Sequence, residues 1–129
     1  MKVLTIRWQR LVNARGLTCE RCGATERAVD EAVARLKDAL RGRGVEVVTE
    51  KVALSAAQFS KDTLQSNRLW LAGKPLEAWL AGESGGSRCC GECGDAECRT
   101  LTVDGTTHEV IPPELILKAG LLAAETLRD

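Results

Sequence analysis

Aromatic residues and surplus charge are both scarce in this chain. Among 129 residues there are three tryptophans, one phenylalanine and no tyrosine, and 18 basic side chains balance 18 acidic ones. Proteins that bind nucleic acids depend on surplus basic residues for the phosphates and on aromatic rings for base stacking. The composition therefore predicts a protein without a nucleic-acid partner.

Long apolar runs are also missing. No stretch approaches the roughly 18 apolar residues that a membrane-spanning helix needs, and residues 1–10 lack the apolar core of a signal peptide. We therefore expect no membrane association and a cytoplasmic location. Structural disulfides are rare in the reducing cytoplasm, so cysteines in such a protein need another explanation.

Six cysteines form two clusters in the sequence. The first cluster is Cys19-Glu20-Arg21-Cys22, and the second holds Cys89, Cys90, Cys93 and Cys98. Clustered thiols in a cytoplasmic protein indicate redox or metal chemistry more than packing. The single histidine, His108, is left outside the site because no nucleophile signature accompanies it.

The first half of the chain has a simple pattern. Its length and 44% hydrophobic content fit one domain over residues 1–129. Alternating apolar residues predict strands over residues 2–12 and 45–52, and helical spacing predicts a helix over residues 25–41 between them. The first strand is apolar on both faces, as a central strand is. Strand, helix and strand with short connections are typical of a right-handed parallel unit.

The second half is less regular. It predicts a strand, a glycine turn and an extended or helical piece over residues 68–80, a flexible loop over 81–88, and a hairpin over 100–111 with Asp-Gly at its turn. Residues 55–67 fit a short helix or a polar loop equally well. A terminal helix opening at Pro112 has an apolar face. That face is made of Leu115, Ile116, Ala119, Leu122, Ala123 and Leu127.

Two pairs of large apolar residues carry further expectations. Trp70 and Trp79 are expected in the core, where lone aromatic residues at strand spacing usually pack. Leu117 and Leu121 lie off the apolar face of the terminal helix. They would mark the contact surface of a homodimer.

The first cluster fits a redox dithiol. If Cys19 lies at the start of its helix, the positive end of the helix dipole favours its thiolate, and Arg21 adds to this while Glu20 opposes it. Cys19 is then the attacking sulfur and Cys22 the resolving thiol that closes the disulfide. The second cluster, Cys89, Cys90, Cys93 and Cys98, would act as a second redox group that accepts the disulfide.

The same sulfurs also fit a metal site. Cys19, Cys22, Cys93 and Cys98 could form a four-sulfur site for zinc or an iron–sulfur cluster, or for a soft toxic ion such as mercury or arsenite. The adjacent side chains of Cys89 and Cys90 diverge, which makes them poor ligands for one ion. The sequence leaves the two interpretations open.

The order of the predicted parts resembles the thioredoxin-like fold. Within it, the chain is similar to a family of small uncharacterised prokaryotic proteins that is catalogued as a domain of unknown function. The resemblance covers nearly the whole chain and rests on five groups of residues. These are Trp8-Gln9-Arg10, Thr18-Cys19-Glu20-Arg21-Cys22-Gly23, Ser66-Asn67-Arg68-Leu69-Trp70 with Gly73-Lys74-Pro75-Leu76-Glu77, Cys93-Gly94-Asp95-Ala96-Glu97-Cys98-Arg99, and Pro112-Pro113-Glu114-Leu115-Ile116.

The resemblance implies an α/β fold. We expect a single thioredoxin-like domain with a central mixed sheet flanked by helices and a cysteine-rich loop before the last hairpin. The expected function is thiol–disulfide exchange without a cofactor, with protein thiols or disulfides as partners. The alternative is a cysteine-ligated metal-binding module with a soft metal ion as its partner. One departure favours the alternative: thioredoxin-type oxidoreductases place a cis-proline beside the dithiol, where this chain has Ser66-Asn67-Arg68.

Overall fold

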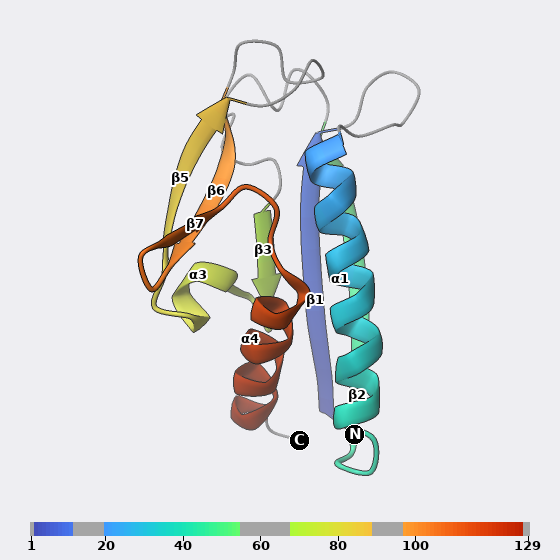
Figure 1. Cartoon of the computed structure of the whole chain (residues 1–129). Helices are drawn as coiled ribbons and strands as arrows, with labels where there is room; N and C mark the ends of the chain where they lie inside the picture. The colour runs from blue at the N-terminus through green and yellow to red at the C-terminus, as the bar shows by residue number, and fades with distance from the viewer. Residues whose placement is uncertain (1, 12–19, 55–67, 89–96, 128–129) are drawn as a thin grey trace.

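The structure is a computed structural model of the chain, and it describes residues 2–11, 20–54, 68–88 and 97–127 (Figure 1). These residues form a mixed α/β architecture of two sheets and three helices. In chain order the elements are β1 (Lys2–Leu11), α1 (Glu20–Ala39), β2 (Val45–Leu54), β3 (Arg68–Leu71), β4 (Lys74–Pro75), α3 (Leu76–Trp79), β5 (Glu83–Arg88), β6 (Glu97–Val103), β7 (Thr106–His108) and α4 (Pro113–Thr126).

The first sheet has the strand order β2-β1-β3-β4. β1 pairs with β2 in parallel along its whole length, from Lys2 opposite Val45 to Leu11 opposite Leu54. β3 runs antiparallel to β1, and the short edge strand β4 runs antiparallel to β3. The predicted unit of strand, helix and parallel strand is therefore confirmed. The helix α1 begins at Glu20, ahead of the predicted start at Thr25.

Helices α1 and α4 lie side by side and pack on one face of this sheet (Figure 1). That face carries Leu4, Ile6 and Trp8 of β1, each fully buried against apolar residues of the two helices. On the opposite face, Val3 is 46% exposed and Val48 is 37% exposed. The prediction of a central strand is confirmed for β1, but its second apolar face is open in the part of the chain that the structure describes.

The second sheet corrects one prediction. Residues 83–88 were expected in a flexible loop, and they form β5, the edge strand of an antiparallel sheet ordered β5-β6-β7. Gly85 lies opposite Thr100, and a Cβ atom there would stand 3.1 Å from the Thr100 hydroxyl oxygen. Glycine therefore permits close strand pairing at this position. In the sequence, the same glycines predict a flexible loop.

The hairpin of β6 and β7 confirms the predicted Asp-Gly turn. Asp104 has a φ of 52° and Gly105 a φ of 80°, and a two-residue turn with positive φ at both positions matches the right-handed twist of the flanking strands. The piece after the glycine turn at Gly73 is both extended and helical, because β4 leads directly into α3. Pro75 sits in the edge strand β4, where no ladder hydrogen bond is lost.

The tryptophan prediction is half right. Trp79 packs against the core, and its indole Nε1 donates a hydrogen bond to the Leu71 carbonyl at 2.8 Å. Trp70 lies between Leu69 and Leu71, both of which are buried, so strand alternation turns it to the open face of the sheet. The guanidinium of Arg68 lies 4.6 Å from its ring centre. Trp70 is therefore not a core residue.

The terminal helix α4 follows its predicted pattern with one exception. Ile116, Ala119 and Ala123 are fully buried, as expected, but Leu122 is 37% exposed. At about 100° per residue, Leu122 falls beside the buried face. No helix among the described residues is long and apolar enough to cross a membrane.

Candidate thiol site

The elements that flank the two cysteine clusters have their ends at the same end of the molecule. β1 ends and α1 begins there, and β5 ends and β6 begins there as well (Figure 1). Within the second sheet, Arg88 at the end of β5 lies opposite Glu97 at the start of β6. We refer to this end of the molecule as the thiol end.

The structure describes the backbone of two of the six cysteines. Cys22 is in the first turn of α1, and Cys98 is near the start of β6, opposite Ser87 of β5. Cys19 directly precedes α1 in the sequence and lies outside the described residues, as do Cys89, Cys90 and Cys93. The predicted dithiol and the predicted four-sulfur set therefore stay predictions. Among the described residues, no group of three or more His, Cys, Asp or Glu residues could hold a metal ion.

A buried threonine fixes the first half of α1 to the segment that leads into α4. Thr25 is fully buried, and its hydroxyl oxygen accepts a hydrogen bond of 3.4 Å from the Ile111 backbone N–H. Thr25 follows Cys22 by less than one helical turn. The contact therefore holds the turn of α1 that carries Cys22.

A lysine of β2 also holds this part of α1. The Lys51 Nζ lies 3.0 Å from Glu26 Oε2 and 3.1 Å from Asp30 Oδ1. Burial lowers the pKa of Lys51, but the hydrogen bonds and charges of the two carboxylates outweigh it, so the pKa lies above its ordinary value of 10.5. The folded state therefore holds the Lys51 proton more tightly than the unfolded chain does.

We predict a modest, pH-dependent loss of stability for Lys51→Gln. Because the pKa is raised on folding, the contribution of Lys51 is complete below pH 10.5 and is lost as the pH rises through the folded-state value. The Lys51 side chain is 33% exposed, so the loss at pH 7.5 should be about 1 kcal/mol or less. Urea unfolding at pH 7.5 and 11, followed by tryptophan fluorescence, measures it.

The control for this experiment is Lys37→Gln, a change at an exposed lysine of α1. It should leave the free energy of unfolding unchanged at both pH values. If the free energies of unfolding of wild type and Lys51→Gln differ as much at pH 11 as at pH 7.5, the charge of Lys51 is not the source of the stabilisation.

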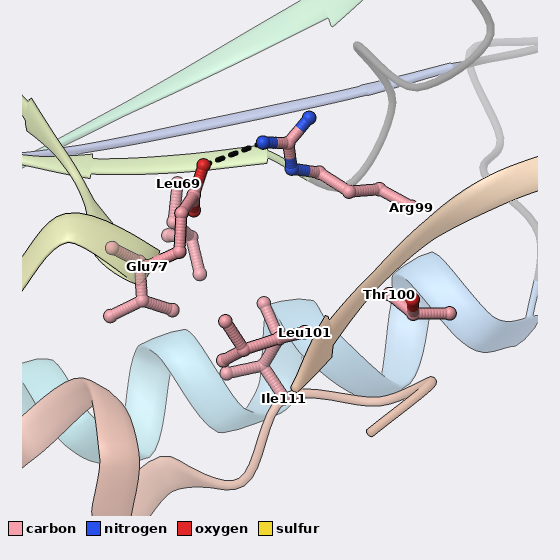
Figure 2. A pocket seen from close by; sticks show the side chains of 7 residues that line it. Leu69, Glu77, Arg99, Thr100, Leu101 and Ile111 are labelled. Atoms are coloured by element: carbon pink, nitrogen blue, oxygen red, sulfur yellow. Dashed lines mark hydrogen bonds and ion pairs between the residues drawn. The ribbon is translucent and has the colours of Figure 1, made fainter. Parts of the chain in front are cut away.

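A partly buried ion pair holds the start of β6. Arg99 Nη2 lies 2.6 Å from Glu77 Oε1 of α3, and the two side chains are 11% and 18% exposed (Figure 2). Beside the pair is a cavity of about 10 Å³, enough for one water molecule. The other residues that line it are Leu69, Leu76, Thr100, Leu101 and Ile111. Because Arg99 follows Cys98, the pair fixes the strand backbone next to that cysteine.

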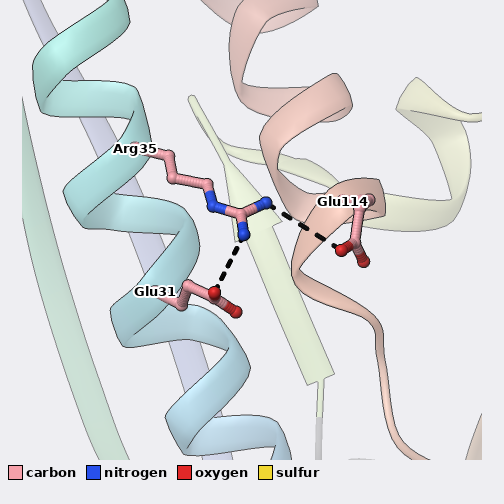
Figure 3. A network of polar contacts seen from close by, with 3 residues as sticks. All are labelled: Glu31, Arg35 and Glu114. Atoms are coloured by element: carbon pink, nitrogen blue, oxygen red, sulfur yellow. Dashed lines mark hydrogen bonds and ion pairs between the residues drawn. The ribbon is translucent and has the colours of Figure 1, made fainter.

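An exposed polar contact also lies between the two long helices. Arg35 of α1 lies 2.9 Å from Glu31 Oε1 on the same helix and 3.9 Å from Glu114 Oε1 at the start of α4 (Figure 3). All three side chains are close to half exposed or more, so the contact is worth little in stability. It lies on the outer side of the contact between α1 and α4.

Comparison with known proteins identifies the family. Residues 4–120 match the family described as Domain of unknown function (DUF2703). The chain is also 42% identical over 113 residues to an uncharacterised protein of Archaeoglobus fulgidus, covering 88% of this chain and 82% of that protein. The chain therefore belongs to the DUF2703 family. This confirms the prediction, made from the sequence, that the chain is a member of an uncharacterised family. No solved structure matches the chain.

Proposed function

We propose that this protein is a cytoplasmic thiol–disulfide exchange protein of the thioredoxin-like type. In this proposal Cys19 is the attacking thiol, Cys22 is the resolving thiol, and the second cluster is a second redox group. The observation that carries the proposal is that α1 and β6, the elements that carry Cys22 and Cys98, both begin at the thiol end (Figure 1). Two dithiols at one end of a molecule can exchange a disulfide.

The order of the elements supports the thioredoxin-like part of the proposal. A parallel β1-α1-β2 unit is followed by the antiparallel β3-β4 pair and ends with α4, in line with the order that the sequence resemblance implies. The Cys-x-x-Cys motif falls at the start of the helix in the parallel unit. The β5-β6-β7 sheet, which contains the predicted hairpin, lies between α3 and α4 in the chain, and its strand β6 carries Cys98 of the second cluster.

The proposed reaction consists of two successive exchanges with the partner, followed by transfer of the disulfide within the protein. The Cys19 thiolate attacks one sulfur of a partner disulfide, forms a mixed disulfide and releases the other partner sulfur as a thiolate. Cys22, after losing its proton to solvent, attacks the Cys19 sulfur and releases the second partner thiolate. The partner gains two electrons, and Cys19 and Cys22 become a disulfide. The thiolates of Cys93 and Cys98 then reduce that disulfide in the same way and become a disulfide themselves.

The α-helix contributes to the first step. α1 is 20 residues long, and the unpaired N–H groups of its first turn carry the positive end of the helix dipole. This field favours the thiolate of a cysteine that directly precedes the helix. Thr25 and Lys51, which hold the first half of α1, keep this helix end in place against β2 and the segment before α4.

We predict that Cys22→Ser accumulates a mixed disulfide on Cys19. With the resolving thiol absent, the first exchange still occurs but the second does not, so the adduct persists. The reduced variant is incubated with a small disulfide-bonded peptide at pH 7.5, quenched with acid, and mapped by mass spectrometry. At least half of the trapped peptide should be on Cys19.

The matched control carries Cys19→Ser as well as Cys22→Ser, and it should trap about as little peptide as background thiols do. The exchange proposal fails if the single variant traps no more peptide than this control. The assignment of roles fails if most of the adduct maps to Cys89, Cys90, Cys93 or Cys98.

A second candidate function is a cysteine-ligated metal-binding module. Ser66-Asn67-Arg68 favours it, because these residues stand where thioredoxin-type oxidoreductases carry a cis-proline against the dithiol. Thiolates suit zinc, iron–sulfur clusters and soft toxic ions, and the ligands would be Cys19, Cys22, Cys93 and Cys98. Stoichiometric zinc, or iron with sulfide, in protein purified without oxygen or chelator would support this candidate. Metal-free protein with six titratable thiols would support the exchange proposal.

A further inference from the structure

The outward face of α4 forms an open, mostly apolar groove of about 320 Å³. On the other side of the same helix, Ile116, Ala119 and Ala123 are fully buried against the core. The groove is lined by Glu114, Leu117, Lys118, Leu121, Leu122 and Glu125. Of its three leucines, Leu117 and Leu121 are partly buried and pack against the edge of the core, whereas Leu122 is 37% exposed.

We propose that this groove is the contact surface of a symmetric dimer, in which α4 of a second copy packs antiparallel to α4. A two-fold axis makes every contact reciprocal. With the axis between Leu121 and Leu122, each Leu121 faces Leu122 of the partner subunit. The same register places Lys118 opposite Glu125 of the partner subunit, and symmetry makes this pair twice.

The charge pattern is what selects a second copy in this orientation. Lys118 and Glu125 are seven residues apart, about 10 Å along the helix, so they do not pair within one copy. No ion pair of either residue is recorded in the part of the chain that the structure describes. A parallel arrangement would place Lys118 against Lys118, whereas the antiparallel arrangement pairs opposite charges around apolar residues. Charge complementarity of this kind fixes register and orientation.

The size of the surface sets the expected affinity. A 14-residue helix is about 21 Å long, and one helix pair covers less than the roughly 800 Å² per partner of a standard interface. We therefore expect a dissociation constant on the order of 10 to 100 µM. α4 extends away from the thiol end (Figure 1), so dimer formation leaves that end accessible and the inference does not depend on the proposed function.

Charge reversal tests the proposal on the full chain, kept reduced so that no disulfide links two copies. The protein concentration is varied from about 5 to about 500 µM, a range that brackets the expected dissociation constant. Over this range, sedimentation equilibrium should show the wild type changing from monomer to dimer. Lys118→Glu and Glu125→Lys should each weaken the dimer at least about tenfold, because each places like charges opposite each other. The double swap, Lys118→Glu with Glu125→Lys, should restore the wild-type constant within about threefold.

Lys37→Glu is the matched control, because it makes the same change of net charge as Lys118→Glu on an exposed part of α1. It should leave the dissociation constant unchanged. Both α4 positions are exposed, and circular dichroism verifies that each variant is folded. A wild type that stays monomeric across the range overturns the proposal, as do single variants that dimerise normally or a double swap that does not recover.

Discussion

Arg99→Met should lower the free energy of unfolding by about 3 kcal/mol. The substitution leaves Glu77 without its closest cation in a site where its own side chain is only 18% exposed and the Arg99 side chain 11% exposed. A carboxylate held away from water needs a partner, and breaking a buried pair costs more than the pair itself contributes. Urea unfolding followed by tryptophan fluorescence at pH 7.5 measures the loss.

The chain offers a control with nearly the same distance between the charged atoms and different burial. Arg41 Nη2 lies 2.7 Å from Asp38 Oδ1, but these side chains are 79% and 74% exposed. Arg41→Met should therefore cost less than about 0.5 kcal/mol. If both arginine variants lose the same stability, burial is not what makes the Arg99 pair important.

A double variant separates the ion pair from simple packing. Replacing both charges, in Arg99→Met with Glu77→Leu, removes the unpaired carboxylate and fills the space with apolar atoms, which is often neutral in stability. The double variant should recover about 2 kcal/mol relative to Arg99→Met alone. A double variant no more stable than the single one would contradict an electrostatic origin.

The Arg99–Glu77 pair shows what the sequence could not reveal. Both residues belong to segments that the resemblance singled out, yet they are 22 positions apart, and nothing in either segment indicates the contact. The same holds for Lys51 with Glu26, 25 positions apart, and for Thr25 with Ile111, 86 positions apart. Spacing rules detect pairs within one helix turn or strand, whereas these contacts exist only once the chain is folded.

Local patterns did predict most of the elements around the thiol end. β1, α1 and β2 have strong periodicity, because each places one apolar face against the core. The Asp-Gly turn is recognisable because its two residues must both adopt positive φ angles. β5 was missed because its segment has no apolar alternation and its glycines suggest a loop. It is a strand because β6 supplies its hydrogen-bonding partner and the glycines allow close approach. A tertiary contact therefore overrides the local preference.

The two cysteine clusters could be found in the sequence, whereas the contacts that hold the elements around them could not. The two clusters are visible as motifs, and the fold brings the elements that carry Cys22 and Cys98 to one end (Figure 1). The residues that fix these elements, among them Thr25 and Arg99, are ordinary polar residues with no motif. A rigid frame around reactive groups usually depends on such contacts.

Gly120→Leu should also destabilise the protein by about 3 kcal/mol, the upper part of the usual range for overpacking a core. Gly120 is buried where α4 meets α1, and a Cβ atom there would lie 2.5 Å from Leu36 Cδ1 and 2.8 Å from Leu36 Cδ2. Leu36 is fully buried, so it has no solvent to turn into. Glycine costs about 1 kcal/mol in a helix interior, and here it permits the two helices to pack closely.

Thermal or urea unfolding of Gly120→Leu and three further variants tests this contact. Ala34→Leu, at an exposed position of α1, adds the same side chain outside the core and should change stability by no more than about 0.5 kcal/mol. Leu36→Ala alone should cost about 3 kcal/mol, because it leaves a cavity. In the double variant with Gly120→Leu, the space left by Leu36→Ala accommodates the new leucine. The double variant should therefore lose at least about 2 kcal/mol less stability than the sum of the two single losses. Strictly additive losses would mean that Gly120 and Leu36 do not define the contact between α1 and α4.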